Sequence, residues 1–165
     1  MDDLQRIIAS FEAAPVVWKG AYAYVVHPLT DGVPRIEANL LAAVIDQSLR
    51  SLSDWSMDTM LTVEAMGLPV AIPLSHHLAK PLLVVRKRSY GFDDEIVLDQ
   101  STGYSAGALY INDIRQGERV VIYDDMLSTG GTLRPVVKAL RRAGTTVVGA
   151  LVLAAKGDAV ERMSE

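Results

Sequence analysis

The feature of this sequence that most limits its fold is a series of short apolar segments separated by segments with helical periodicity. The apolar segments read TMLTV, PLLVVRK, RVVIY and TVVGALVLAA. Helices are predicted between them, from EAMGLP to about Ala79 and from Thr132 to Arg142. Strands that are apolar throughout are buried on both faces, as in a parallel sheet covered by helices. The sequence therefore predicts an α/β fold, a mainly parallel sheet with helices on both faces.

The N-terminal part has a different pattern. Leu4, Ile7, Ile8 and Phe11 have helical spacing and predict a short first helix, and a second amphipathic helix follows from Leu40 to Leu52. Between them, AYAYVVHPLTDGVP predicts one strand and a turn-rich loop. The stretch from Gly91 to Gly107 has only weak strand patterning, and ALYI closes it.

Composition narrows the class of protein. The 165 residues are half apolar and suit one compact domain, residues 1–165. The net charge of −4 argues against a nucleic-acid partner, and the absence of cysteine excludes disulfides and thiolate metal sites. MDDLQRIIASF lacks the basic start of a signal peptide, and no apolar run is long enough to cross a membrane. We therefore expect a cytoplasmic protein with no membrane partner.

The most informative stretch is VVIYDDMLSTGGTL. Asp124 and Asp125 follow the apolar strand Val120–Tyr123, and the small-residue loop Ser128–Thr132 then leads into a helix. Parallel sheets bind ligands at the carboxyl ends of their strands. Backbone N–H groups at a helix start lack partners inside the helix, and the two glycines of the loop allow an anion to approach them closely. The stretch predicts a phosphate site beside two acids.

The acids repel a phosphate, so they must serve another part of the same ligand. Carboxylates accept hydrogen bonds from vicinal hydroxyls and also hold cations. A ribose 5-phosphate has both a phosphate and a diol. Neither GxxxxGK[ST] nor GxGxxG occurs in the chain, so a common nucleotide loop is not the explanation. The alternative is an ordinary strand-to-helix turn that carries an acid pair.

VVIYDDMLSTGGT closely resembles the phosphoribosyl-pyrophosphate (PRPP) signature of type I phosphoribosyltransferases. YVVHPLTDGVP, TVEAMGLP, VVRKRSYG and TGYSAG are similar to segments of the purine-salvage branch, especially its short archaeal-type hypoxanthine/guanine enzymes and their adenine-specific relatives. The resemblance extends from about Pro15 to Gly157. It implies the three-layer fold of that family, with a twisted sheet, an N-terminal helix and hood over about residues 1–36, and a mobile hairpin loop over residues 89–107.

The implied activity is transfer of 5-phosphoribosyl from PRPP to a purine base in purine salvage, leaning to hypoxanthine/guanine. An adenine phosphoribosyltransferase is one alternative. PRPP and the purine are the expected small-molecule partners, Mg²⁺ the expected cofactor, and a homodimer the expected assembly. The resemblance assigns no direct protein ligand set to Mg²⁺, which PRPP itself holds, with Asp124 or Asp125 as a candidate contact.

The resemblance also implies residue roles. Asp124 and Asp125 bind the ribose hydroxyls and, with Lys87, favour the charges that develop during transfer. The 5-phosphate is assigned to Ser128, Thr129, Gly130, Gly131 and Thr132. The pyrophosphate is assigned to Glu64, Ala65, Met66, Gly67, Arg86, Lys87 and Arg88. Met66 departs from adenine enzymes, which usually have a basic residue there, so more of the charge falls on the three cations. Alternatives are a plain turn for EAMG and a solvated basic patch for RKR.

In the mobile loop the candidate contacts are Ser101, Thr102 and Tyr104, whereas Glu95 is either an acid/base or a surface charge. An exposed hairpin without ligand contacts is the alternative. Closure of such a loop excludes water, which protects an activated ribose from hydrolysis.

The base is assigned to Met126 and Leu127 on one face and to Tyr24 and Val25 of the hood on the other, although strand aromatics also serve as core. Lys156 follows LVLAA, where 6-oxopurine enzymes place a lysine that donates to the exocyclic oxygen, and this favours hypoxanthine/guanine. A solvated strand-end lysine is the alternative. His27 is assigned a structural role.

Two other classes of protein remain as alternatives. A PRPP-binding regulatory protein on the same fold would keep the phosphate site but control nucleic-acid binding, for which the net charge is unsuited. A phospho-acceptor receiver domain would match Asp124, Asp125, Thr129 and Lys156 superficially, but its acid pair belongs at the first strand. Neither alternative explains the whole pattern.

Overall fold

A computed structural model describes residues 2–20, 22–101 and 106–164 of the chain. The chain divides into two compact units, Met1–Asp54 and Trp55–Glu165, which are described separately below. The prediction of a single domain over residues 1–165 remains a prediction.

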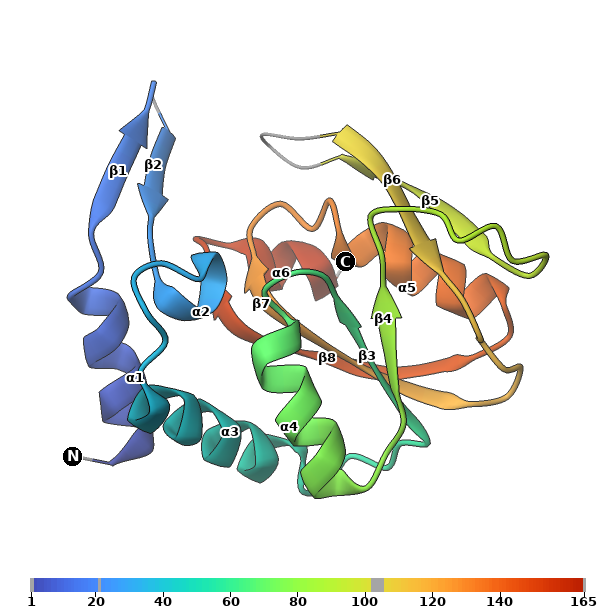
Figure 1. Ribbon diagram of the computed structural model, residues 1–165, viewed down its shortest axis with the longest axis horizontal. Helices are drawn as coiled ribbons and strands as arrows, with labels where there is room; N and C mark the ends of the chain where they lie inside the picture. Colours follow the sequence, from blue (N-terminus) through green and yellow to red (C-terminus); the bar gives the residue numbers. More distant parts are fainter. Residues whose placement is uncertain (1, 21, 102–105, 165) are drawn as a thin grey trace. The chain divides into compact units, whose positions relative to one another are not determined.

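The first unit contains three helices and a hairpin. Its elements are α1 (Asp3–Glu12), β1 (Val16–Lys19), β2 (Tyr22–Val25), α2 (Pro28–Asp31) and α3 (Ala38–Leu52) (Figure 1). The side chain of Asp2 caps α1 by accepting from the N–H of Gln5 at 2.8 Å. The predicted helices are confirmed. The sequence predicted one strand here, but the structure has two, because β2 pairs antiparallel with the earlier strand β1. Trp18 of β1 is 68% exposed, so a pattern of buried residues does not mark this strand.

His27 has a structural role in this unit, as expected. It is fully buried and stacks on the ring of Phe11 at 3.8 Å. Its Nδ1 accepts from the N–H of Leu29, and its Nε2 lies 3.0 Å from Ser10 Oγ. Since the Ser10 hydroxyl donates to the carbonyl of Ile7, the neutral Nε2–H tautomer satisfies every partner. Burial lowers the pKa of His27, which agrees with a neutral ring.

The second unit is built on a four-stranded sheet in the order β4–β3–β7–β8, with every neighbouring pair parallel. Its strands are β3 (Thr59–Val63), β4 (Leu82–Val85), β7 (Arg119–Leu127) and β8 (Thr146–Ala155). The helices are α4 (Leu68–Leu78), α5 (Leu133–Arg142) and α6 (Ala159–Ser164). All five residues of β3 are buried, as predicted for a strand covered on both faces, and they include Thr59 and Thr62. The prediction of an α/β fold with a parallel sheet is confirmed.

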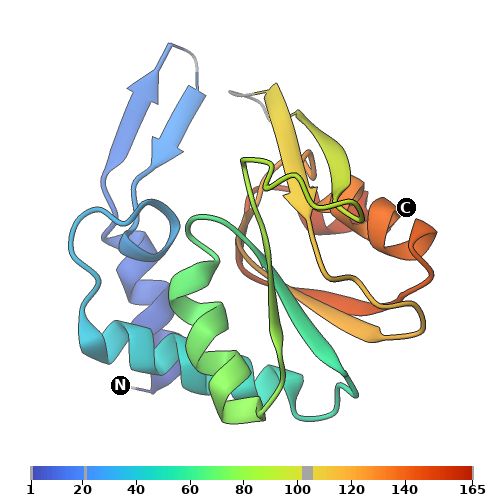
Figure 2. The same ribbon diagram turned by 45° about the vertical axis from the view of Figure 1, so that its right-hand side comes forward.

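The two crossover helices cover opposite faces of this sheet. From the central β3–β7 pair, α4 leads outward to β4 and α5 leads outward to β8. Since strand–helix–strand crossovers are right-handed, connections in opposite directions place their helices on opposite faces. Figure 2 shows α4 on one side of the sheet and α5 with α6 on the other. The carboxyl ends of β3 and β7 therefore form a topological switch point, the usual ligand crevice of such sheets.

In the second unit, β7 and α6 differ from the sequence prediction, and in the first unit α2 forms within the stretch predicted as a loop. Strand β7 does not end at Tyr123: it continues to Leu127, because β8 still pairs with it at Asp124↔Val152 and Met126↔Ala154. The short helix α6 was not predicted.

The stretch with weak strand patterning, Gly91–Gly107, leads into an antiparallel hairpin of β5 (Ile96–Ser101) and β6 (Ala106–Ile111). Strand β6 begins two residues before the predicted ALYI, which starts at Ala108.

Candidate active site

The candidate site begins where the two central strands separate. The last paired positions of β3 and β7 are Thr62 and Tyr123. Beyond this pair, β7 continues along β8 alone, whereas the chain after β3 turns toward α4. Asp124 and Asp125 are thus the first residues past the point of separation. The sequence therefore places its acid pair at the topological switch point, where sheets of this kind usually bind ligands.

The two acids differ in burial. Asp124 is only 7% exposed, and Asp125 is half-buried. The N–H of Asp125 donates to Asp124 Oδ1 at 3.1 Å. Burial, followed by the nearby Asp125 carboxylate, raises the pKa of Asp124 well above its usual range. An acid pair with one buried member is stabilised by hydroxyl donors, which is what a ribose diol supplies.

The loop predicted to hold the 5-phosphate, Ser128–Thr132, is called the phosphate loop below and connects β7 to the first turn of α5. Gly130 has φ +77° and contributes its carbonyl to the first turn, accepting from the N–H of Arg134 at 2.9 Å. Thr129 Oγ1 accepts from the N–H of Gly131 at 3.2 Å. Thr132 is the N-cap residue of α5 but makes no side-chain cap hydrogen bond. The loop thus places the N-terminus of the ten-residue helix α5 at the same edge of the sheet as the acids.

Helix α6 braces this loop, a contact that sequence reasoning missed. Arg162 donates to the carbonyl of Ser128 at 3.2 Å and pairs with Asp158 at 3.0 Å. Arg134 donates to the carbonyl of Arg162. A Cβ added at Gly130 would lie 2.8 Å from Met163 Sδ, so the loop and α6 are closely packed. In the sequence, the helical spacing of Ala159 and Met163 after Gly157 could have predicted α6.

The segment predicted to hold pyrophosphate, Glu64–Gly67, joins β3 to α4. Its Glu64–Ala65 peptide bond is cis. Gly67 is buried against β3: a Cβ there would lie 2.1 Å from Thr62 Oγ1 and 3.0 Å from the Val63 carbonyl. Only glycine fits this close approach, so the residue is required by packing as well as by the proposed anion contact.

Glu64 is engaged with the basic segment after β4. Its Oε2 lies 2.8 Å from Arg86 Nε, and its Oε1 accepts from the N–H of Lys87. A carboxylate that pairs with Arg86 cannot itself attract a pyrophosphate, so its place in the site is to position the neighbouring cations. Lys87 is exposed at the carboxyl end of β4, whereas Arg88 donates to the hydroxyl of Tyr90 at 3.0 Å. This arrangement favours Lys87 over Arg86 and Arg88 as a ligand contact.

Glu95 does not suit an acid/base role. Its carboxylate accepts hydrogen bonds from Ser89 Oγ, the N–H of Tyr90 at 3.0 Å and Asn112 Nδ2 at 3.1 Å. These bonds, that of Ser89 first, hold the pKa of Glu95 below its usual value. Glu95 thus links the segment before β5 to Asn112, the residue that follows β6. Of the predicted loop contacts, Ser101 ends β5, and Thr102 and Tyr104 lie outside the described residues.

The predicted base contacts are not all brought together. Met126 is half-buried near the end of β7. Leu127 is 5% exposed and packs in the hydrophobic cluster with Leu133 and Val136 of α5. Its role beside the base stays a prediction.

Lys156 is exposed beside the phosphate loop, and its N–H donates to the Leu127 carbonyl at 2.8 Å. The hood residues Tyr24 and Val25 belong to the first unit, where Tyr24 is half-buried and Val25 is exposed. Their part in base binding stays a prediction.

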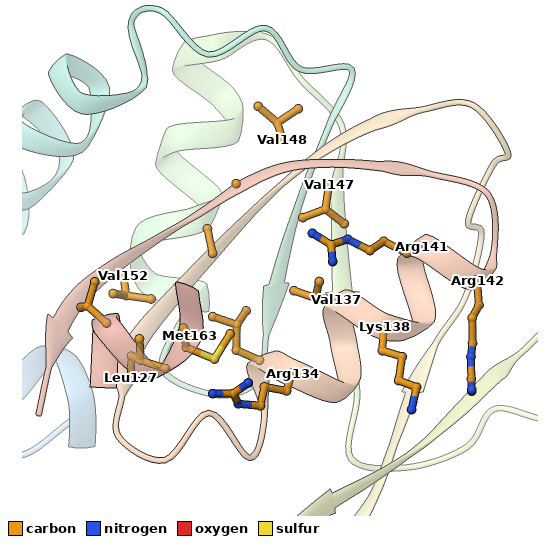
Figure 3. Close-up of a pocket in the computed structure, with 14 residues that line it drawn as sticks. Leu127, Arg134, Val137, Lys138, Arg141, Arg142, Val147, Val148, Val152 and Met163 are labelled. Atoms are coloured by element: carbon orange, nitrogen blue, oxygen red, sulfur yellow. The ribbon is translucent and has the colours of Figure 1, made fainter. Parts of the chain in front are cut away.

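A groove of about 800 Å³ lies elsewhere in the second unit, along α5, β8 and α6. Figure 3 shows Leu127, Arg134 and Met163 at one end and Arg141 and Arg142 at the other. Neither acid lines it, so it is separate from the candidate site.

No group of three His, Asp or Glu side chains is placed to hold a metal ion within residues 2–20, 22–101 and 106–164. Across the same part of the chain, every helix is too short or too polar to traverse a bilayer.

Comparison with known proteins agrees with this geometry. The profile of the phosphoribosyl transferase domain family matches residues 34–165. A hypoxanthine/guanine phosphoribosyltransferase of Ferroglobus placidus is 46% identical over 160 residues, which cover 97% of this chain and 85% of that protein. The Methanosalsum zhilinae protein of the same name is 47% identical over 154 residues, covering 93% and 80%. The structure of adenine phosphoribosyltransferase from Rhodothermus marinus superposes with a TM-score of 0.76 at 22% identity, covering 98% and 92% of the two chains, which shows a shared fold.

Proposed function

Because this chain belongs to the phosphoribosyl transferase domain family, we propose that it transfers the 5-phosphoribosyl group of PRPP to a purine, preferentially hypoxanthine or guanine. The observation that carries the proposal is the acid pair at the switch point, with Asp124 buried and Asp125 half-buried, followed along the chain by a glycine-rich helix start. A ribose diol and a 5-phosphate fit these two features in that order. The names of the relatives support the 6-oxopurine preference, as does the position of Lys156 beside the phosphate loop.

Each group in the site has a role in such a transfer. Breaking the bond between C1 of the ribose and pyrophosphate develops positive charge on the ribose and negative charge on the leaving group. Asp124 and Asp125 orient the ribose through its hydroxyls and favour the positive centre, and the phosphate loop fixes its other end. Lys87, positioned by the contact of its N–H with Glu64, stabilises the departing pyrophosphate. The purine nitrogen then attacks C1, and no covalent enzyme intermediate is required.

Mg²⁺ fits this site as a companion of the substrate. Oxygen-rich phosphates are preferred ligands of this cation, and it usually keeps few protein ligands in phosphate sites. When bound, it would neutralise charge on the leaving pyrophosphate, with Asp124 or Asp125 as the nearest candidate protein contact.

We propose, from the resemblance to the family, that the protein forms a homodimer and that it is located in the cytoplasm. The exposed apolar side chains of Val16, Val17 and Trp18 in the first unit are compatible with a partner surface. Sedimentation of the purified protein would measure the assembly directly.

The test of function is a base-selection assay. The protein is given PRPP and Mg²⁺ with adenine, hypoxanthine, guanine, xanthine or orotate, and nucleotide formation is followed for each base. We expect turnover with hypoxanthine and guanine. Turnover of adenine alone would identify the adenine alternative, and turnover of orotate without any purine would refute the purine assignment. Nucleic-acid binding without base-dependent release of pyrophosphate would favour the regulatory alternative.

A further inference from the structure

Thr62 is a buried polar residue at the point where the two halves of the proposed site meet. It is fully buried in β3, between Leu61 and Val63, and its hydroxyl donates to the carbonyl of Tyr123 at 2.9 Å. Tyr123 immediately precedes the acid pair. Because Thr62 and Tyr123 form the last pair of β3 with β7, this bond is made just before the strands separate.

The same hydroxyl also supports the loop on the other side of the crevice. A Cβ on Gly67 would lie 2.1 Å from Thr62 Oγ1, so the loop after β3 rests directly on this oxygen. One side-chain atom therefore contacts the residue before the acids and the glycine of the proposed pyrophosphate loop. Both contacts lie in the second unit and are shielded from water, where a hydrogen bond is least weakened by competition.

We propose that Thr62 is a positioning residue that sets the acid pair and the Glu64–Gly67 loop relative to one another. This inference rests on the proposed function, since it concerns the ends of a PRPP molecule that spans both. PRPP carries its diol and its pyrophosphate on adjacent carbons of one ribose ring. A site that holds both groups needs its two loops at a fixed separation, because small misplacements in a binding site reduce rates strongly. Thr62 is not a catalytic residue, because it is buried beneath the site.

The chain offers a matched control in Thr59, at the opposite end of the same strand. Thr59 is 2% exposed and pairs with Val120. Within the described part of the chain its hydroxyl has no hydrogen-bond partner. Replacing this residue by valine removes a buried hydroxyl from the same strand without touching either loop.

The experiment compares Thr62→Val, Thr62→Ser and Thr59→Val in the purified full-length chain. Steady-state kinetics with PRPP and hypoxanthine give kcat and KM, the dissociation constant of guanosine monophosphate is measured by calorimetry, and thermal melting reports stability. We expect Thr62→Val to raise KM for PRPP about tenfold, the size of effect that loss of one buried hydrogen bond produces. We expect kcat at saturating PRPP to fall less, Thr62→Ser to restore KM, and Thr59→Val to leave it unchanged.

Several outcomes overturn the inference. If KM of Thr62→Val stays within twofold of wild type, or if Thr62→Ser is as impaired as Thr62→Val, the hydroxyl positions nothing. An equal effect of Thr59→Val would assign the loss to general destabilisation. If Thr62→Val does not fold, Thr62→Ala, which is smaller and also lacks the hydroxyl, takes its place with the same expected KM. A wild-type chain that neither turns over any base nor binds the nucleotide refutes the proposed function itself, and the role of Thr62 with it.

Discussion

Two acids at the carboxyl edge of the same sheet have opposite surroundings. Glu64, after β3, pairs with Arg86 at 2.8 Å and accepts from the N–H of Lys87. Asp124, at the equivalent edge of β7, is buried beside another carboxylate, and its pKa is raised by that burial. Glu64 is thus ion-paired within the protein, whereas Asp124 accepts from the N–H of Asp125 but lies buried beside a second carboxylate. The difference separates a scaffold acid from the proposed ligand-binding acid, although the sequence shows both simply as acids after a strand.

The largest effect should come from removing charge at the acid pair, Asp124 and Asp125. We expect Asp125→Asn to lower kcat/KM for PRPP about 100-fold, because hydrogen bonds to a charged acceptor contribute about 1.5–3 kcal/mol. Steady-state kinetics measure the loss, and circular dichroism checks that the fold is intact. Asp46→Asn, which removes an exposed acid of α3, is the matched control and should keep full activity. A fully active Asp125→Asn enzyme would contradict the ribose role.

A smaller effect is expected at the loop that packs against β3. Gly67→Ala places a Cβ 2.1 Å from Thr62 Oγ1 and 3.0 Å from a backbone carbonyl, so the loop must shift. We expect KM for PRPP to rise about tenfold and the free energy of unfolding to fall by about 1–3 kcal/mol, as for other overpacked sites. Gly107→Ala is the control, since a Cβ there meets no atom within 4 Å. Equal behaviour of the two variants would show that Gly67 is not restricted by packing.

The scaffold acid should matter less than the ligand-binding pair. Glu64→Gln removes the charge that pairs with Arg86 but keeps an oxygen that accepts from the N–H of Lys87. Both partners are partly exposed, so the loss is about 1 kcal/mol at most, which corresponds to a KM increase of about fivefold or less. Kinetics at low and high salt would show the effect shrinking with ionic strength. A loss as large as that of Asp125→Asn would break the distinction drawn between the two acids.

The last prediction concerns stability and pH, where the expected change is smallest. Because the folded-state pKa of Asp124 is raised, its carboxyl favours folding fully only below its unfolded pKa of about 3.9, and this contribution is lost as pH rises through the folded pKa. Asp124→Asn has no carboxyl at this position, so its stability does not fall with the titration of this group. Thermal melting should therefore show the variant more stable than wild type at pH 8, with a smaller difference at pH 4. A difference that does not change with pH would mean that the carboxylate is not destabilised by its surroundings.

Much of the fold was predictable because it follows from local patterns. The uninterrupted apolar strands Thr59–Val63 and Val120–Tyr123 required burial on both faces, and the intervening helices followed from periodicity. The errors occurred where pairing partners decide the outcome. The extension of β7 to Leu127 depends on β8, and the strand Val16–Lys19 depends on its hairpin partner. The roles of Glu64 and Thr62 depend on residues 22 and 61 positions away, which no local pattern contains.

By itself the sequence determined the chemistry at this edge of the sheet: an acid pair and a glycine-rich helix start are adjacent in the chain, as the proposed binding of one ribose 5-phosphate requires. Covalent neighbours of this kind remain neighbours in any fold. Only the tertiary structure decided that Glu64 is ion-paired and that Asp124 is buried. Burial and ion pairing arise when strands that are separate in the sequence end at the same edge of the sheet. The pairing of Glu64 with Arg86, the burial of Asp124 and the contact of Thr62 with Tyr123 all follow from that convergence.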